Sequence, residues 1–353
     1  MKVQRVKIIL FIVGTMFLFA SFLIAEVECL SNLEEALKIA SKNNMNIALT
    51  VSAEWCPYCQ KLEKEIFQTS IGEEVFKNII CVKVDFDTSY GQKIKRKYRI
   101  IGLPTVVFLN SKGKEIDRVI GYDSKEQFLE LVKKYGSGKD SLPLLQEKLK
   151  KEPNNPELIF EVGKRLLLRG NEENGIKLLK KILTIDPNNS SDYADNALFV
   201  LGRYYSRVKE NPEIGLKYWR ELFFKYPNSD YGTGALSWML RAYKDLNKLD
   251  EAHSLLKEEI NKNPDNPYLY FSIGYFYLNY NKENLRDVLP YIKKGLELAS
   301  DNLDLLILSA RIYENLKMNR EAIENLERAL ELEPDNKSLR DRLKKLIKQE
   351  KSK

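Results

Sequence analysis

A turn signal that recurs at a nearly fixed interval is the feature that most limits what this chain can fold into. The signal combines proline or aspartate with asparagine or aspartate and returns at intervals of about 34 to 40 residues. The turns are Glu152-Pro153-Asn154, Asp186-Pro187-Asn188, Tyr226-Pro227-Asn228, Asn263-Pro264-Asp265, Ser300-Asp301-Asn302 and Glu333-Pro334-Asp335. Between them the apolar residues follow helical spacing. The region therefore predicts an all-α solenoid of stacked helical hairpins.

The interval is close to that of the tetratricopeptide repeat (TPR), which is about 34 residues long. Small residues recur where paired helices must approach closely, at Gly163, Gly175, Gly202, Gly215, Ala252, Gly274, Ala310, Ala322 and Ala329. Large residues such as Tyr205 and Trp219 fall where the repeat needs bulk. We predict about five degenerate repeats, closed by a polar capping helix over 337–348. The tyrosines between Tyr268 and Tyr280 are interpreted as packing residues of these repeats.

Residues 30–134 show a different pattern, in which short apolar runs alternate with helical spacing. Strands are predicted over 47–53, 79–86, 105–109 and 116–120, and helices from 33, from 56, over 89–98 and after 124. Ser31 and Ser124 are the expected caps of the first and last of these helices. The pattern predicts an α/β domain with a central mixed sheet flanked by helices.

A domain boundary is expected near residue 139, because Gly136-Ser137-Gly138 has the composition of a flexible linker. We therefore assign 29–138 to the α/β domain and 139–353 to the repeat domain. The linker is short, so both a fixed interface and a hinge between the domains remain open.

The first 28 residues have the layout of a signal peptide or N-terminal membrane anchor. Lys2, Arg5 and Lys7 precede an uncharged apolar run from Ile8 to Ala25. This run is long for a cleaved signal and nearly reaches the roughly 20 residues that span a bilayer. We expect an extracytoplasmic protein, in the periplasm or cell envelope, with an anchor or a late cleavage site. A buried core helix is the disfavoured alternative, because the run lacks an amphipathic period.

The segment Ala53-Glu54-Trp55-Cys56-Pro57-Tyr58-Cys59 follows a predicted strand and opens a helix. At a helix start, free backbone N–H groups and the helix dipole stabilise a thiolate. Cys56 is therefore the expected nucleophile. Pro57 suits the first helical position, and Cys59 lies nearly one turn further, close enough to close a disulfide with Cys56 and act as the resolving thiol.

With this motif, residues 30–135 resemble the thioredoxin superfamily, and within it the periplasmic terminal domain of the DsbD family of thiol:disulfide interchange proteins. The resemblance also rests on Leu62-Glu63-Lys64, Phe67, Gly102-Leu103-Pro104-Thr105 and Gly121. It implies that Pro104 is cis and lies against the redox pair, and that the backbone of Leu103 pairs with a bound substrate strand. Trp55 and Tyr58 would shape the apolar surface around the sulfur.

Two positions depart from thioredoxin itself. Thr50 stands where thioredoxin has a buried acid that assists the resolving cysteine, and Gln60 replaces the usual lysine after the second cysteine. Proton handling at Cys59 therefore differs from the family pattern. The Pro57-Tyr58 pair between the cysteines is that of glutaredoxins, and it does not fix the direction of electron flow.

Several other functions are disfavoured by the sequence. The net charge of +7 is small for 353 residues and gives no nucleic-acid footprint. No second cysteine pair has zinc-ligand spacing, His253 is remote, and Gln60 excludes a haem attachment motif, so neither a metal nor another cofactor is expected. A structural Cys56–Cys59 disulfide is a poor staple because its loop is short. Cys81 is expected to be an inert core thiol, and Cys29 a free thiol near the membrane or one lost on processing.

The most favoured hypothesis is an extracytoplasmic protein-disulfide oxidoreductase that acts through Cys56 and Cys59, with a TPR arm that binds an unidentified protein partner. Reduction is favoured by the resemblance alone, and a membrane electron donor is then implied. One alternative is an envelope assembly scaffold in which the TPR arm dominates. Another keeps the enzyme but makes it an oxidase or isomerase of exported proteins.

Overall fold

The computed structural model describes residues 26–351. The apolar run of the expected signal or anchor lies outside these residues. Within them, no helix combines the length and apolar character that crossing a bilayer requires.

The first part of the chain forms a five-stranded mixed sheet in the order β1-β3-β2-β4-β5. Its strands are β1 (Cys29–Leu30), β2 (Asn46–Ser52), β3 (Ile79–Asp85), β4 (Thr105–Leu109) and β5 (Glu115–Ile120). Strand β3 pairs in parallel with β1 and β2, whereas β4 runs antiparallel to β2 and β5. The predicted strands are thus present within a residue at each end, and the two-residue strand β1 is added.

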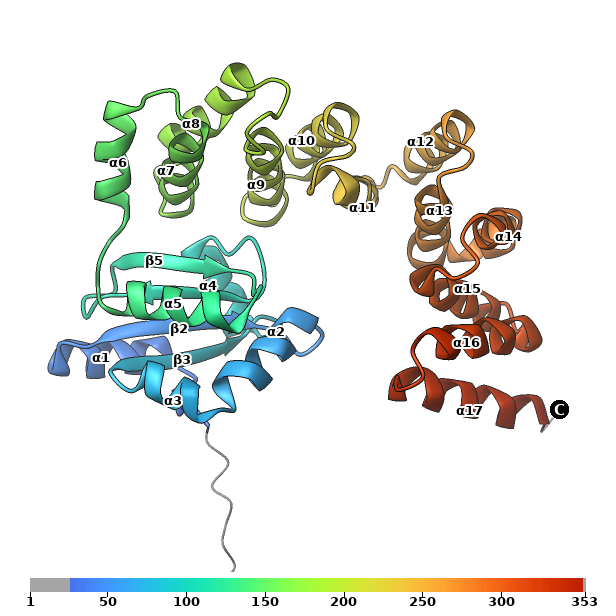
Figure 1. The fold of residues 1–353 in the computed structure, drawn as a ribbon, viewed down its shortest axis with the longest axis horizontal. Helices are drawn as coiled ribbons and strands as arrows, with labels where there is room; N and C mark the ends of the chain where they lie inside the picture. The colour runs from blue at the N-terminus through green and yellow to red at the C-terminus, as the bar shows by residue number, and fades with distance from the viewer. Residues whose placement is uncertain (1–25, 352–353) are drawn as a thin grey trace, which may run out of the picture.

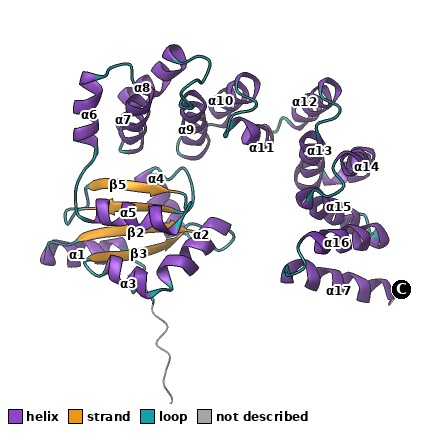
Figure 2. Cartoon of the chain, viewed as in Figure 1, coloured by secondary structure: helices purple, strands orange, loops and turns teal. Residues whose placement is uncertain are grey.

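Helices cover both faces of this sheet (Figures 1 and 2). They are α1 (Leu33–Asn43), α2 (Pro57–Leu62) with its π-helical continuation (Glu63–Phe67), α3 (Ser70–Phe76), α4 (Ser89–Tyr98) and α5 (Lys125–Gly136). One apolar layer joins α1 and α4 to the sheet, and the other joins α2, α3 and α5 to it. Because both faces are covered, β2 is an almost uninterrupted apolar run rather than an alternating one.

The caps of these helices agree with expectation at one end and differ at the other. Ser124 accepts a hydrogen bond from the N–H of Gln127, as predicted for the start of α5. The cap of α1 is Asn32 rather than Ser31, because the Asn32 side chain accepts the bond from Glu35 N at 3.0 Å. The prediction of Ser31 was wrong by one residue.

The rest of the described chain is helical. Its helices are α6 (Leu142–Lys151), α7 (Pro156–Leu168), α8 (Glu172–Ile185), α9 (Ala194–Arg207), α10 (Pro212–Lys225), α11 (Gly232–Asp245), α12 (Leu249–Lys262), α13 (Pro267–Tyr280), a 3-10 segment (Lys282–Val288), α14 (Leu289–Leu298), α15 (Leu303–Asn315), α16 (Asn319–Leu332) and α17 (Lys337–Lys351). They stack as antiparallel hairpins from α7–α8 to α15–α16. We call this stack the arm, and in Figure 1 it curves away from the sheet and back in a hook.

Turn chemistry and small residues explain these hairpins. Pro156, Pro212 and Pro267 occupy the first helical position, where a missing N–H leaves no bond unmade, and an asparagine cap precedes each. Where two helices cross, a large side chain on one helix requires a small residue on the other. A Cβ on Gly202 would lie 2.7 Å from the ring of Trp219, which is fully buried.

The junction between sheet and arm is packed rather than flexible. Gly136 is the last residue of α5, and a Cβ there would clash with Ile79 Cδ1. Gly138 adopts a positive φ of 84° beside Asn46. The glycines therefore serve close contact and a tight turn, which is the fixed interface of the two alternatives left open by the sequence.

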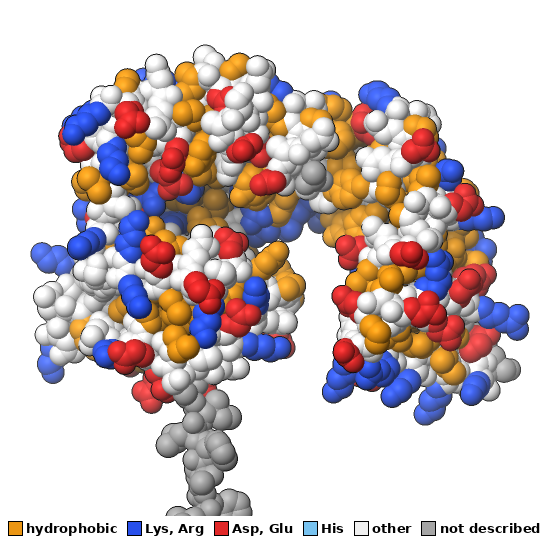
Figure 3. Space-filling view, viewed as in Figure 1, with side chains coloured by type: hydrophobic (Ala, Val, Ile, Leu, Met, Phe, Trp, Pro, Cys, Tyr) orange, Lys and Arg blue, Asp and Glu red, His pale blue; other side chains and the backbone are white. Residues whose placement is uncertain are grey.

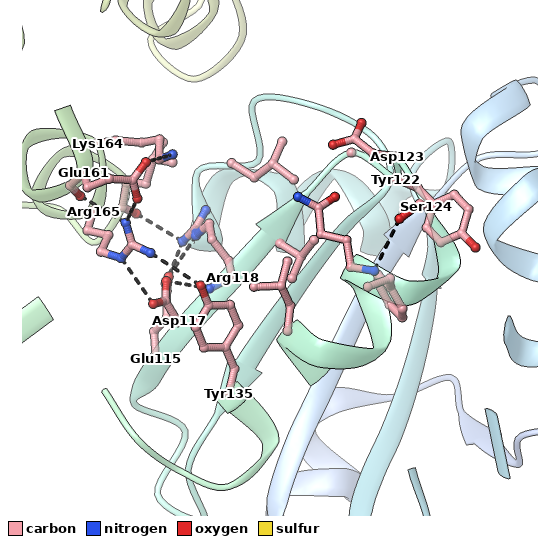
Figure 4. A pocket seen from close by; sticks show the side chains of 17 residues that line it. Glu115, Asp117, Arg118, Tyr122, Asp123, Ser124, Tyr135, Glu161, Lys164 and Arg165 are labelled. Atoms are coloured by element: carbon pink, nitrogen blue, oxygen red, sulfur yellow. Dashed lines mark hydrogen bonds and ion pairs between the residues drawn. The ribbon is translucent and has the colours of Figure 1, made fainter. Parts of the chain in front are cut away.

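A network of buried charges fixes the arm against β5 (Figure 4). Asp117, which is 1% exposed, accepts hydrogen bonds from Arg165 of α7 at 3.1 Å and from Ser141, and Arg169 lies 3.8 Å away. Arg118 forms a two-pronged ion pair with Glu115 and also donates to Leu168 O. The cavity drawn in Figure 4 lies beside this network. Because these charges satisfy one another, we interpret them as an interface between the arm and the sheet.

Candidate active site

The redox motif begins where β2 ends and α2 starts. Cys56 is the N-cap of α2, and its Sγ accepts a hydrogen bond from the N–H of Cys59 at 3.3 Å. Pro57 occupies the first turn of the helix, as predicted. The Cys56 sulfur therefore lies at the start of α2, where it accepts a backbone N–H.

The two thiols of the motif are both reduced and both buried, but they differ in their hydrogen bonding. Cys59 is buried, and this burial, reinforced by the hydrogen bond to Cys56, raises the pKa of Cys59 to about 12. Its proton is therefore held at neutral pH and shared with the Cys56 sulfur. The hydrogen bonding of the pair therefore suits Cys56 to attack first and Cys59 to react second.

The loop before β4 packs against the redox pair. The Leu103–Pro104 peptide bond is cis, and Leu103 packs against the small cluster of Ala53, Cys56 and Cys59. Two bonds fix the loop, from Thr105 Oγ1 to Gly102 O at 2.7 Å and from the N–H of Gly121 to Pro104 O at 2.8 Å. No hydrogen bond within 26–351 uses the backbone N–H or C=O of Leu103. Within these residues the backbone polar groups of Leu103 are therefore not used by the fold.

Trp55 and Tyr58 present aromatic surface beside the pair. They are 59% and 60% exposed, which is unusual for such large side chains. Trp55 donates to Asp87 Oδ2 at 2.7 Å and meets Phe86 edge to face at 6.4 Å between centroids. Its orientation is thus held by residues that follow β3, while more than half of Trp55 stays exposed.

The positions that depart from thioredoxin have distinct surroundings. Thr50 is 1% exposed, and its Oγ1 has no hydrogen-bond partner. Lys83, its neighbour across the β2–β3 ladder, pairs instead with Glu63 at 2.7 Å. Gln60 turns away and donates to Glu54 O. The buried acid of thioredoxin thus has no counterpart on β2.

The arm contacts the loop of the redox site. Arg203 of α9 donates from Nε to Ile101 O at 2.7 Å, and its guanidinium lies 4.3 Å from the ring centroid of Trp238 on α11. Burial, together with nearby Arg207 and Arg241, lowers the pKa of Arg203 to about 9. Sequence reasoning missed this contact because the repeat pattern marks the residues between helices and not those on the arm's open face.

A second cysteine pair was also missed. Cys29 and Cys81 face each other in the β1–β3 ladder, with 4.5 Å between their Cα atoms, and form a disulfide. The expectations of an inert Cys81 and a free or removed Cys29 were therefore wrong. The signal that could have found the pair is the match between Cys29 and the predicted strand at 79–86, had a short edge strand been considered.

Neither histidine nor acidic residues complete a metal site. Among residues 26–351, no group of three or more histidine, cysteine, aspartate or glutamate side chains is arranged to hold a metal ion. His253 instead contacts the hydroxyl of Tyr277 at 3.1 Å inside the arm.

Two family models match separate parts of this fold. Residues 33–136 match that of a thioredoxin-like domain, and residues 303–336 match that of a tetratricopeptide repeat. The chain thus carries a thioredoxin-like domain joined to TPR repeats.

Individual relatives match the first of these parts. The chain is similar to the thiol:disulfide interchange protein DsbD of Pasteurella multocida (strain Pm70), with 26% identity over 119 residues, or 32% of this chain and 21% of that one. It spans about a fifth of the length of such curated relatives. Among solved structures it is similar to a DsbH oxidoreductase, with 24% identity and a TM-score of 0.27 over 31% of this chain and 86% of that one. A thermophilic TPR protein of Thermus thermophilus gives 20% identity and a TM-score of 0.37 over 55% of this chain and 99% of that one.

Proposed function

We propose that the protein is an extracytoplasmic thiol-disulfide oxidoreductase that reduces disulfides of other proteins. The observation that carries this proposal is the unequal pair of thiols. Both thiols are buried, but Cys56 receives an N–H bond at a helix start, whereas burial and the hydrogen bond to Cys56 raise the pKa of Cys59 to about 12. A pair built to stay closed would need no such difference.

The first step joins the protein to its substrate. The Cys56 thiolate attacks one sulfur of the substrate disulfide, forming a Cys56–substrate disulfide, and the other substrate sulfur leaves as a thiolate that takes a proton from solvent. Leu103 supports this step, since its free backbone N–H and C=O are positioned to pair with the extended chain on either side of the substrate cysteine. Pro104 fixes that edge, and Trp55, Pro57 and Tyr58 form the surface around it.

The second step releases the substrate. Cys59 loses its proton and attacks the Cys56 sulfur, so the mixed disulfide breaks and the second substrate thiol leaves. Two electrons have then passed to the substrate, and Cys56 and Cys59 are joined as a disulfide. A protein dithiol must restore the reduced pair, and for an exported reductase we propose a membrane electron donor as its source. Burial and the hydrogen bond to Cys56 raise the pKa of Cys59 in the reduced protein, so Cys59 keeps its proton until the mixed disulfide has formed.

Two features support a location outside the cytoplasm. The Cys29–Cys81 disulfide has a structural position between two strands, and such bonds persist mainly in oxidising compartments. The basic and apolar start of the chain has the layout of a segment that directs export.

The arm is proposed to hold a protein partner close to the redox pair. Stacked helical hairpins provide extended binding surfaces, and docking on the arm would raise the local concentration of a substrate near Cys56. The scaffold alternative predicts instead that the arm works without the thiols.

A trapping experiment tests the proposal. In a Cys59→Ser variant the second step cannot occur, so disulfide-linked complexes with substrate proteins should accumulate in cell-envelope extracts and disappear on reduction. The Cys56→Ser variant is the matched control and should trap none. Absence of complexes, together with normal function of the Cys56→Ser variant in the cell, would favour the scaffold.

The reduction potential of the pair separates the two enzymatic directions. Titration against glutathione or dithiothreitol should give a value near that of thioredoxin, about −270 mV, for a reductase. A value near about −120 mV would instead assign an oxidase.

A further inference from the structure

A small cavity lies between the redox motif and the arm. Its volume is about 150 Å³. Trp55, Phe86 and Lys95 form the wall on the thioredoxin-like domain, and Ser206, Arg207, Pro212, Trp238, Arg241, Ala242 and Asp245 form the wall on the arm. Figure 3 shows basic and hydrophobic side chains on the underside of the arm, in the hollow that faces this domain. A group bound in the cavity would touch Trp55, the residue before Cys56.

The charges around this cavity do not balance. Lys95 pairs with Glu210 at 3.3 Å, and Asp245 pairs with Lys244 at 3.3 Å. For Arg207 and Arg241, the described part of the chain offers no carboxylate within ion-pair distance. The Nε of Arg207 is also buried without a hydrogen-bond partner. Two guanidinium groups are thus left with unused donors at the same wall.

The packing around these guanidinium groups makes binding of an anion more favourable. Arg203 and Arg207 lie 4.3 Å and 5.3 Å from the ring centroid of Trp238, so like charges share one aromatic surface. Burial and the nearby Arg241 lower the pKa of Arg207 to about 10, which still leaves it charged at neutral pH. Buried charges without a partner cost free energy that a bound anion would recover. The local electrostatics therefore favour a negatively charged ligand.

We infer that Arg207, Arg241, Trp238 and Trp55 bind an acidic segment of the disulfide-containing protein on which Cys56 acts. This inference rests on the proposed function and names its substrate class. Aspartate and glutamate carboxylates match the planar donors of guanidinium, and the exposed ring of Trp55 accepts the apolar parts of the same segment.

Helix α9 links the loop that would pair with the substrate strand to the cavity that would bind its acidic segment. Arg203 on this helix contacts Ile101, beside the open edge of Leu103, and Arg207 one turn further lines the cavity. A strand paired with Leu103 can therefore continue into the cavity without leaving the protein surface. The acidic side chains would lie a few residues from the substrate cysteine.

Two disulfide-bridged peptides of equal length test the inference, one with aspartate and glutamate beside a cysteine and one with asparagine and glutamine there. The full exported chain, reduced beforehand, is mixed with each peptide, and the rate of peptide reduction is measured. We expect the wild-type protein to reduce the acidic peptide about tenfold faster at low salt, as one to two charge-assisted bonds would give. The preference should shrink as salt is raised, because part of the site is exposed.

Substitution of the arginines should remove this preference. In an Arg207→Gln/Arg241→Gln variant the ratio of the two rates should fall toward one. Arg241 is exposed, so the single Arg241→Gln variant retains the fold and should lower the ratio in part. The matched control is Arg311→Gln/Arg320→Gln, which removes two exposed arginines from α15 and α16 and should keep the wild-type ratio. Equal rates for both peptides in the wild type, or a preference that survives in the double variant, would overturn the inference.

A binding measurement separates this inference from the proposed function. In the Cys56→Ser variant no exchange can begin, so the anisotropy of a labelled acidic peptide without cysteine reports the arginines alone. Binding that is lost with Arg207→Gln/Arg241→Gln, in a protein that reduces neither peptide, would retain the acidic-segment site and reject the reductase. Reduction of both peptides without any such binding would retain the reductase and reject the site.

Discussion

The thioredoxin-like domain contains two cysteine pairs on one sheet, and they are built for opposite purposes. Cys29 and Cys81 join neighbouring strands across 52 residues of sequence, whereas Cys56 and Cys59 lie within a single helical turn. The first pair is closed and the second is open. A long loop makes a disulfide stabilising, and a helix start makes a thiol reactive. All four residues are cysteines, so their different chemistry follows from where each one lies in the fold.

The largest expected effect separates the pairs by activity. Cys56→Ser should lower the rate of disulfide reduction by roughly a thousandfold or more, since it removes the attacking atom. Cys29→Ala/Cys81→Ala should leave that rate within about twofold at a temperature where the protein is folded. Insulin reduction measured side by side checks both. A comparable loss in the second variant would mean that the strand disulfide takes part in exchange.

The free energy of unfolding should depend more on the Cys29–Cys81 pair than on the Cys56–Cys59 pair. Loss of the Cys29–Cys81 bond should cost about 4 kcal/mol of unfolding free energy in the chain-entropy estimate for a loop of this size. Urea unfolding of the Cys29→Ala/Cys81→Ala variant measures the cost, with Cys56→Ala/Cys59→Ala as the control of equal cysteine count. The comparison fails if the control variant loses more stability than the strand variant.

Alkylation should distinguish the two thiols inside the open pair. Because burial raises the pKa of Cys59 from its ordinary value of 9.0 to about 12, iodoacetamide at pH 8 should modify Cys59 at least about a hundredfold more slowly than Cys56. The raised pKa favours the neutral thiol, so this contribution to the stability of the reduced protein is complete below pH 9 and lost as the pH rises toward 12. Mass spectrometry of the labelled peptides over this range gives the answer. Equal labelling at pH 8 would contradict the assigned roles.

The smallest effect concerns the strand beneath the open pair. Thr50 buries a hydroxyl without a partner, so Thr50→Val should stabilise the protein by about 1 kcal/mol. Thermal unfolding measures this stabilisation. The Thr50→Ser variant is the control because it keeps the hydroxyl. A destabilised valine variant would show that the hydroxyl has a bound partner such as water.

Much of the fold followed from sequence periodicity. Val51 and its neighbours in β2, and Phe128 and Val132 in α5, show the apolar spacing of the elements that they form. The cis peptide before Pro104 followed from the family resemblance. These features depend on local spacing or on a motif, both of which a single sequence displays.

The remaining features depend on contacts that no local pattern displays. Cys29 meets Cys81 only because a two-residue strand pairs in parallel at the sheet edge. Arg203 reaches Ile101 only because α9 packs over the loop before β4. Serine and asparagine both suit the N-cap position, so the sequence could not distinguish Ser31 from Asn32. The backbone geometry places Asn32 there.

The hydrogen bond from Arg203 to Ile101 has a thermodynamic consequence for the whole chain. It joins the arm to the loop that carries Leu103 and Pro104. If a partner binds the arm more tightly when this bond is formed, then a strand seated on the loop must tighten partner binding by the same factor. Occupancy of the arm and occupancy of the redox loop are in that case reciprocal quantities, and either one can be read from the other.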